Sequence, residues 1–241
     1  MTAVELLTVD VGNSSIGLGA WTGDVVQFQR VRDPEDALAW LRGGHAPILL
    51  VSVAPQRRER VLRGLPEARR AGLKEPGSPP SWLGPAGLLE SAGRDRVAAV
   101  LAVAGGPAVV VDAGTAVTVE AVDAGGRWLG GFIAPGPTLA ASALPLGTEQ
   151  LKQLASLPAA LVPGQGTETA LRAGLWGLAV GGVDRLVQEA RAAIGADSAP
   201  IIATGGWGAE WMRDSRHAGI RHDAALVHRG LRRWWLSPGA S

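Results

Sequence analysis

The sequence predicts an α/β protein with two similar lobes. Three observations lead to this fold class: short apolar runs typical of buried strands, helical stretches between them, and one strand pattern that occurs twice in the 241 residues. Each copy is a strand, an acidic turn that contains glycine, and two more strands, starting near residue 6 and near residue 108. Such a duplication indicates two α/β lobes that face each other across a cleft. We expect the lobes to span 1–104 and 105–241.

The first lobe is expected to start with three antiparallel strands and to continue with helices around a buried strand. The strands are apolar or alternate in polarity, and they are expected at 6–9, 15–21, 25–31 and 47–53. Helices are expected at 33–41, where Asp33 is a suitable N-cap before Pro34, and at 56–72. A loop rich in Pro, Gly and Ser follows at 75–85.

The second lobe is expected to repeat this plan. A helix at 93–104 ends the first lobe and leads into the next strand. The strands of the second lobe are rich in apolar and β-branched residues, and they are expected at 108–111, 116–122, 128–133 and 200–204. Its helices are expected from about 138, at 168–194, from 207 and from 223.

Composition and charge exclude several classes of protein. The chain has no Cys, which excludes disulfide frameworks, thiolate zinc sites and cysteine nucleophiles. Its formal charge of +1 does not suggest a surface for nucleic acid. The N-terminus has no basic start and carries the acidic residues Glu5 and Asp10, so it does not resemble a signal peptide. The apolar stretch 97–111 is interrupted by Gly105-Gly106-Pro107, so we expect no membrane span. The protein is therefore expected to be soluble and cytoplasmic.

The first acidic turn, Asp10-Val11-Gly12-Asn13-Ser14, follows a strand that is predicted to be buried. Asp10 places a carboxylate at the end of the strand, and Gly12 lets the backbone turn tightly enough for amide groups to approach a phosphate. Asn13 and Ser14 add side-chain donors, and Asp10 can bind Mg²⁺ directly or through water. The same residues also suit an ordinary hairpin turn, and this motif alone does not distinguish the two.

Two further elements favour nucleotide binding. The turn Asp112-Ala113-Gly114-Thr115-Ala116 repeats the chemistry of the first turn, so the two turns can hold a phosphate chain from opposite sides. The strand at 200–204 runs into Gly205-Gly206, whose bare backbone lets a flat base or ribose pack closely. A Gly pair taken singly is more often a plain strand-to-helix turn. The order and spacing of the three elements together make the interpretation specific.

A fourth motif, Gly93-Arg94-Asp95-Arg96, starts a helix, where unpaired amides and the helix dipole favour negative charge. Asp95 can there stay ionised against a substrate hydroxyl, and Arg96 can hold a carboxylate or phosphate with two hydrogen bonds. The structural alternative is a helix-capping Asp in a surface ion pair. Taken by itself, Thr167 suits the N-cap of the helix at 168–194.

Other singled-out residues are expected to be structural. The segment 130–136 is rich in Gly and has no ionisable group, so it is expected to let a strand and the next helix pack closely beside the cleft. His222 and His228 are expected at the surface. The nine tryptophans are expected to be core or interface anchors, because no basic stripe accompanies them.

The motifs together resemble those of the actin/hexokinase-like superfamily and, within it, type III pantothenate kinase. They stand in the order of that family and span nearly the whole chain, as Asp10-Val11-Gly12-Asn13-Ser14, Gly93-Arg94-Asp95-Arg96, Asp112-Ala113-Gly114-Thr115-Ala116, Gly130-Gly131-Phe132-Ile133-Ala134-Pro135-Gly136 and Thr204-Gly205-Gly206. The resemblance implies duplicated ribonuclease H-like folds, as in actin-like ATPases. It implies phosphorylation of pantothenate by ATP at the terminal hydroxyl, the first step towards coenzyme A, by a homodimer whose pantothenate site lies near the subunit interface.

The resemblance also implies roles for individual residues. Those implied to bind ATP are Asp10, Gly12, Asn13, Ser14, Thr115, Gly205 and Gly206. Mg²⁺ is implied near Asp10, and Asp112 is implied to be a ligand of the monovalent cation, K⁺ or NH₄⁺. Those implied to bind pantothenate are Gly93, Arg94, Asp95, Arg96 and Thr167, with Asp95 as the general base and Thr167 acting across the dimer interface.

The chain departs from the family on the pantothenate side. It contains no Tyr, whereas the family usually has one a few residues before the Gly-x-Asp-Arg box, and Gly166 replaces the usual Asn before Thr167. Two other functions stay open: a non-enzymatic regulatory protein of the Bvg accessory factor type, and a kinase of the same fold for another small hydroxylated substrate. Intact Asp10, Asp95 and Asp112 speak against the first, and the Gly-x-Asp-Arg box speaks against the second.

Overall fold

The computed structural model describes residues 3–147, 154, 157 and 160–237, which form two compact units. The first unit consists of Met1–Ala104 and Ala225–Ser241, and the second of Gly105–Ala224. The expected second lobe, 105–241, therefore differs from the second unit at its end. The C-terminal helix packs against the first unit, because its apolar face is covered by a helix and two strands there.

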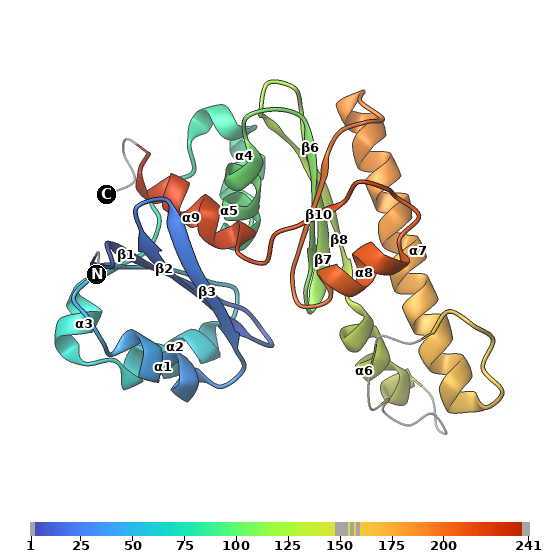
Figure 1. Cartoon of the computed structure of the whole chain (residues 1–241), viewed down its shortest axis with the longest axis horizontal. Helices are drawn as coiled ribbons and strands as arrows, with labels where there is room; N and C mark the ends of the chain where they lie inside the picture. The colour runs from blue at the N-terminus through green and yellow to red at the C-terminus, as the bar shows by residue number, and fades with distance from the viewer. Residues whose placement is uncertain (1–2, 148–153, 155–156, 158–159, 238–241) are drawn as a thin grey trace. The chain divides into compact units, whose positions relative to one another are not determined.

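The first unit is a mixed sheet with helices on both faces (Figure 1). Its strand order is β3-β2-β1-β4-β5, with β1 antiparallel to β2 and parallel to β4. The strands are β1 Leu6–Val11, β2 Ile16–Thr22, β3 Val25–Val31, β4 Ile48–Ser52 and β5 Leu73–Lys74. The helices are α1 Pro34–Leu41, α2 Pro55–Gly64, α3 Glu67–Ala71, α4 Ala86–Ser91, α5 Arg94–Val103 and α9 Leu226–Trp235, with a 3₁₀ turn at Ser81–Leu83.

Alternation along β1 assigns the two faces of this sheet. Leu7, Val9 and Val11 lie in a core cluster with α1 and α2, whereas Thr8 contacts His228 of α9 on the opposite face. The helices α5 and α9 lie side by side there (Figure 1). Gly230 allows this close approach, because a Cβ at this position would overlap the carbonyl of Ala98.

The second unit repeats the strand order of the first, which confirms the duplicated α/β fold. Its sheet runs β8-β7-β6-β9-β10, with β6 antiparallel to β7 and parallel to β9. The strands are β6 Ala108–Ala113, β7 Ala116–Val122, β8 Trp128–Pro135, β9 Ile201–Thr204 and β10 Arg221–His222. The helices are α6 Pro137–Gly147, α7 Thr167–Ile194 and α8 Gly208–Asp214.

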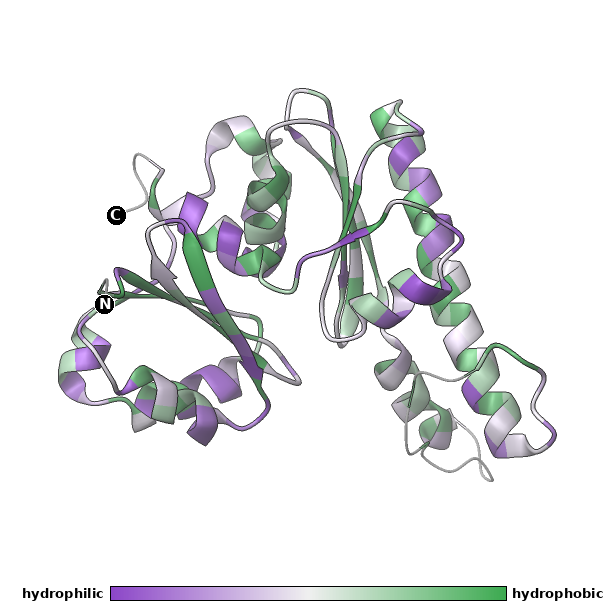
Figure 2. Ribbon diagram, viewed as in Figure 1, coloured by the Kyte–Doolittle hydropathy of each residue, from purple (hydrophilic) through white to green (hydrophobic). Residues whose placement is uncertain are grey.

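The long helix α7 covers one face of the second sheet. It contributes Trp176, Val180, Val183 and Val187 to a core cluster with the apolar residues of β6 and β7. Figure 2 shows hydrophobic and hydrophilic patches alternating along α7, as expected of a helix with one face on a sheet. Within the described residues, no helix combines the length and apolarity needed to cross a membrane.

The prediction of a single helix at 56–72 is wrong in one respect, because this segment forms two helices, α2 and α3. Leu65 is extended, with φ −79° and ψ 138°, and it separates α2 from α3. The residue after it is Pro66, which disfavours helical backbone at the residue that precedes it. The two-residue strands β5 and β10 and the helix α4 were not predicted, because segments this short carry little periodic signal.

His228 is a second correction, because it is buried rather than at the surface, with an exposed fraction of 2%. Its Nδ1 lies 2.8 Å from Thr8 Oγ1, which also accepts the indole N–H of Trp21 at 3.1 Å. Gly17 and Gly19 leave room for the ring, since a Cβ at Gly17 would lie 2.6 Å from its Nε2. Burial, with a smaller contribution from the charge of Arg30, lowers the pKa of His228 to about 3.

The low pKa of His228 predicts loss of stability in mild acid. The unfolded chain binds a proton near pH 6.5, whereas the folded protein binds it only near pH 3, so stability falls as the pH drops between these values. At pH 5 the loss relative to pH 7.5 should be about 2 kcal/mol. Urea unfolding of the wild type and of His228→Asn at both pH values measures it, with the exposed His45→Asn as control. An unchanged pH dependence in His228→Asn would contradict the assignment.

Candidate functional site

The first acidic turn is the hairpin between β1 and β2. The N–H of Gly12 donates to the carbonyl of Ser15 at 2.9 Å, and a Cβ on Gly12 would lie 3.2 Å from the same oxygen. Asp10 is half-buried at the end of β1, while Asn13 and Ser14 are exposed at the tip of the turn. The turn therefore carries its carboxylate at the base and its neutral polar side chains towards solvent.

The Gly-x-Asp-Arg box lies at the same edge of the first sheet as this turn. Because β1 and β4 are parallel neighbours, with Asp10 in register with Val51, their carboxyl ends meet at one edge. Val53, just after β4, donates its N–H to the carbonyl of Val11 at 3.2 Å. A Cβ on Gly93, the N-cap of α5, would lie 3.7 Å from Val53 Cγ1. The fold thus brings together, at one edge of the sheet, two motifs that are about 80 residues apart in the chain.

Asp95 lies in the first turn of α5, and its carboxylate folds back on the helix start. Its Oδ1 accepts the N–H of Arg96 at 2.8 Å, and a Cβ on Gly93 would lie 2.5 Å from the same oxygen. A side chain at the first position of the box would therefore displace the Asp95 carboxylate from this place. Burial raises the pKa of Asp95 above its usual value, and the backbone N–H groups and the charge of Arg96 offset this only in part.

The two arginines of the box differ in their surroundings. Arg94 is exposed and donates to the carbonyls of Pro76 (3.0 Å) and Gly77, and its guanidinium lies 5.4 Å from the ring centroid of Trp234 in α9. These contacts tie the loop at 75–85 and the C-terminal helix to α5, a structural role that sequence analysis missed. Arg96 is half-buried and contributes positive charge beside Asp95.

The second acidic turn and the Gly pair also lie together, at one edge of the second sheet. Asp112 of β6 is in register with Thr204 of β9, the residue before Gly205. Gly205 has φ +90°, and a Cβ there would overlap the backbone of Ala113 in the turn. The missing side chain of Gly205 therefore leaves room for the turn, and the contact of the Gly pair with a base or ribose stays a prediction. Gly206 is exposed.

Three successive backbone carbonyls of this turn accept hydrogen bonds from Trp207 and Gly136. The N–H of Trp207 donates to Ala113 at 3.1 Å, its indole Nε1 donates to Gly114 at 2.8 Å, and the N–H of Gly136 donates to Thr115 at 2.9 Å. A Cβ on Gly136 would overlap the carbonyls of Gly114 and Thr115. Gly136, in the segment 130–136, therefore allows close packing on the turn, whereas the predicted packing was between a strand and the next helix.

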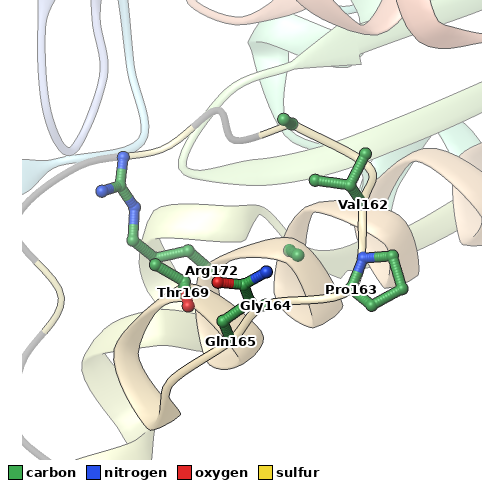
Figure 3. Close-up of a pocket in the computed structure, with 8 residues that line it drawn as sticks. Val162, Pro163, Gly164, Gln165, Thr169 and Arg172 are labelled. Carbon is green, nitrogen blue, oxygen red and sulfur yellow. The ribbon is translucent and has the colours of Figure 1, made fainter.

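Thr167 lies apart from the second turn. It is exposed at the start of α7, about 14 Å of helix before Trp176, whose ring contacts Trp207. The N-cap is Gly166, whose N–H is accepted by Thr169 Oγ1 at 3.1 Å, so the capping role proposed for Thr167 falls to Thr169. A groove of about 460 Å³ lies beside this helix start, lined by Gln165, Thr169 and Arg172 on its polar side (Figure 3).

Each acidic turn offers one carboxylate to a cation. Among the described residues, no group of three or more His, Asp or Glu side chains is arranged to hold a metal ion. Asp10 and Asp112 are the carboxylates of two turns that each contain one glycine. This donor set fits a hard cation whose remaining ligands are phosphate oxygens and water, as is usual for Mg²⁺ bound with a nucleotide.

Comparison with known proteins identifies similar sequences and folds. The family model for type III pantothenate kinases matches residues 6–189. A type III pantothenate kinase of Parafrankia sp. (strain EAN1pec) is 38% identical over 248 residues, covering 94% of this chain and 96% of the relative.

Two solved structures share the fold. A Campylobacter jejuni structure assigned to the Baf family of transcriptional activators superposes with a TM-score of 0.58, at 23% identity, over 95% of this chain and 96% of the other. A Sinorhizobium meliloti structure assigned as a 2-dehydro-3-deoxygalactonokinase gives a TM-score of 0.55, at 14% identity, over 98% of both chains.

Proposed function

The chain belongs to the type III pantothenate kinase family, and from this premise we propose that it transfers the γ-phosphoryl group of ATP to the terminal hydroxyl of pantothenate. The product, 4'-phosphopantothenate, is the first intermediate on the route to coenzyme A. The observation that supports the residue assignments is the sheet edge shared by Asp10 and the Gly-x-Asp-Arg box, where the proposed phosphate turn and the half-buried Asp95 carboxylate both lie.

Asp95 is proposed as the general base. The hydroxyl oxygen of pantothenate forms a bond to the γ-phosphorus while the bond from that phosphorus to the β–γ bridging oxygen breaks, and the hydroxyl proton passes to the Asp95 carboxylate. A raised pKa supports this role, because a more basic carboxylate accepts a proton more readily. Gly93 leaves space for the carboxylate, and Arg96 is proposed to hold the pantothenate carboxylate.

The two glycine turns are proposed to bind ATP. Gly12, Asn13, Ser14 and Thr115 are proposed to bind the phosphates, and Gly205 and Gly206 the adenosine. Kinases of this fold use ATP with a divalent metal, which neutralises phosphate charge in the transition state. Asp10 is proposed to hold Mg²⁺ through phosphate or water, and Asp112 to bind K⁺ or NH₄⁺.

We also propose that the protein is a homodimer in which Thr167 contacts the pantothenate bound to the neighbouring subunit. The exposure of Thr167 at the start of α7, with the helix capped by other residues, supports this role. Light scattering of the purified protein tests the mass. A monomer at all concentrations would contradict the proposal.

The kinase assignment is tested by ADP release with pantothenate, Mg²⁺ and K⁺. We expect turnover that requires pantothenate and that falls when Na⁺ replaces K⁺. No turnover with pantothenate would contradict the assignment and would leave the regulatory alternative or another hydroxylated substrate. Equal turnover in Na⁺ would contradict only the cation role of Asp112. The Baf-family likeness lies below 25% identity and concerns the fold, so it does not favour the regulatory alternative.

A further inference from the structure

We propose that Trp207 is a positioning residue that orients the second acidic turn for the ATP phosphates, an inference that rests on the proposed function of that turn. Trp207 follows the Gly pair at the end of β9 and lies 93 residues from Gly114 in the chain. Its ring is half-buried, and its two N–H groups reach successive carbonyls, those of Ala113 and Gly114.

The two bonds determine which way the peptide groups of the turn face. A trans peptide unit is planar, so its C=O and N–H point in opposite directions. With the Gly114 carbonyl held on Trp207 Nε1 at 2.8 Å, the N–H of Thr115 points away from Trp207. The carbonyl of Thr115, held by Gly136 at 2.9 Å, directs the next N–H in the same manner. Backbone amides whose direction is fixed in a turn of this kind can take part in the concavities that bind phosphate oxygens.

The Trp207 ring is held by its indole hydrogen bond and by packing against the core cluster of the second unit. Its edge-to-face contact with Trp176 has a centroid distance of 5.6 Å, and Trp176 is anchored by its own indole bond to Asp214 at 2.7 Å. Trp207 also lines an apolar cavity of about 450 Å³, together with Pro135 and Val183. The cavity leaves part of the ring surface unpacked, and the bond to Gly114 is the polar contact that joins the indole to the turn.

An ordinary core role for Trp207 gives a different expectation. A Trp that only fills space would, when replaced, lower stability and affect every ligand equally. A Trp that orients the turn should weaken ATP binding selectively, because the amides of the turn would no longer be held in one orientation. Trp211 provides the comparison, since its buried indole lies in the same unit but donates to Asp184, at 3.1 Å, and not to a carbonyl of the turn.

The test is the affinity of Trp207→Phe for a non-hydrolysable ATP analogue, measured by calorimetry without pantothenate. Loss of one hydrogen bond predicts an affinity about 3- to 10-fold weaker. The KM for pantothenate and the thermal midpoint should change little. Trp211→Phe should lower the thermal midpoint and leave the affinity for the analogue unchanged. Trp207→His, which keeps a ring N–H donor, should bind more tightly than Trp207→Phe.

Three results would overturn the proposal: wild-type affinity in Trp207→Phe, an equal loss in Trp211→Phe, or a His variant no tighter than the Phe variant. Since the binding measurement needs no pantothenate, it stays informative when turnover with pantothenate is absent. Absence of turnover in the wild type, with the analogue bound and its affinity dependent on Trp207, would reject the substrate assignment and keep the positioning role.

Discussion

Asp95→Asn is expected to lower kcat for pantothenate phosphorylation by about 10²–10⁴-fold, while it raises the free energy of unfolding at neutral pH. The loss of rate follows because an amide cannot accept the hydroxyl proton. The gain in stability follows because the folded protein buries the Asp95 carboxylate, which raises its pKa, and a neutral side chain of equal size removes that penalty. Opposite effects on rate and stability are expected of a functional group whose charged form is needed for activity but is disfavoured by burial.

The raised pKa of Asp95 also predicts the sign of two pH effects. The folded protein holds the proton more tightly than the unfolded chain, in which the carboxyl titrates near its ordinary pKa of 3.8. The contribution of this group to stability is therefore fully present below pH 3.8 and is lost as the pH rises through the folded pKa. Activity should follow the opposite course, because kcat rises as Asp95 loses its proton.

The measurements are ADP release across pH and urea unfolding at neutral pH, for the wild type and Asp95→Asn. Asp36→Asn is the matched control, because Asp36 also lies in the first turn of a helix, α1, but is exposed. The control should keep wild-type kcat and should not gain stability. Undiminished turnover in Asp95→Asn would reject the general-base role, and a loss of stability would reject the burial penalty.

Gly205→Ala is expected to destabilise the second unit by about 3 kcal/mol or more and to abolish ATP binding. The residue has φ +90°, and its Cβ would overlap the backbone of Ala113. Backbone atoms cannot move aside by rotating a side chain, so the turn and the end of β9 would have to separate. That separation would also break the bond from the N–H of Trp207 to Ala113.

Gly195→Ala is the control that separates crowding from backbone strain. Gly195 is the C-cap of α7, with φ +71°, and a Cβ there meets nothing within 4 Å. It should cost about 1 kcal/mol, the effect of a left-handed backbone alone. Urea unfolding and binding of an ATP analogue compare the two variants. A Gly205→Ala variant that loses no more stability than Gly195→Ala would contradict the close packing of the Gly pair on the turn.

Sequence alone was sufficient for the features that depend on local pattern. The period of apolar residues predicts most strands and long helices, and the repeated acidic turns predict the duplication that the strand orders of the two sheets confirm. The motifs around Asp10, Asp95 and Asp112 identify the family, because each pairs a carboxylate with a glycine two residues away. These signals lie within a few residues of one another, so no knowledge of the fold is needed to see them.

Only the tertiary structure decided the features that depend on contacts between distant segments. Three such features are the packing of α9 in the first unit, the burial of His228 against Thr8, and the bond from Trp207 to Gly114. Each depends on contacts between residues that are about 90 or more positions apart in the chain. A helical stripe in the sequence shows that a face will be covered but not which segment covers it. The sequence therefore determined the chemistry of each motif, and long-range packing decided which neighbours raise a pKa, exclude a side chain or hold a carbonyl.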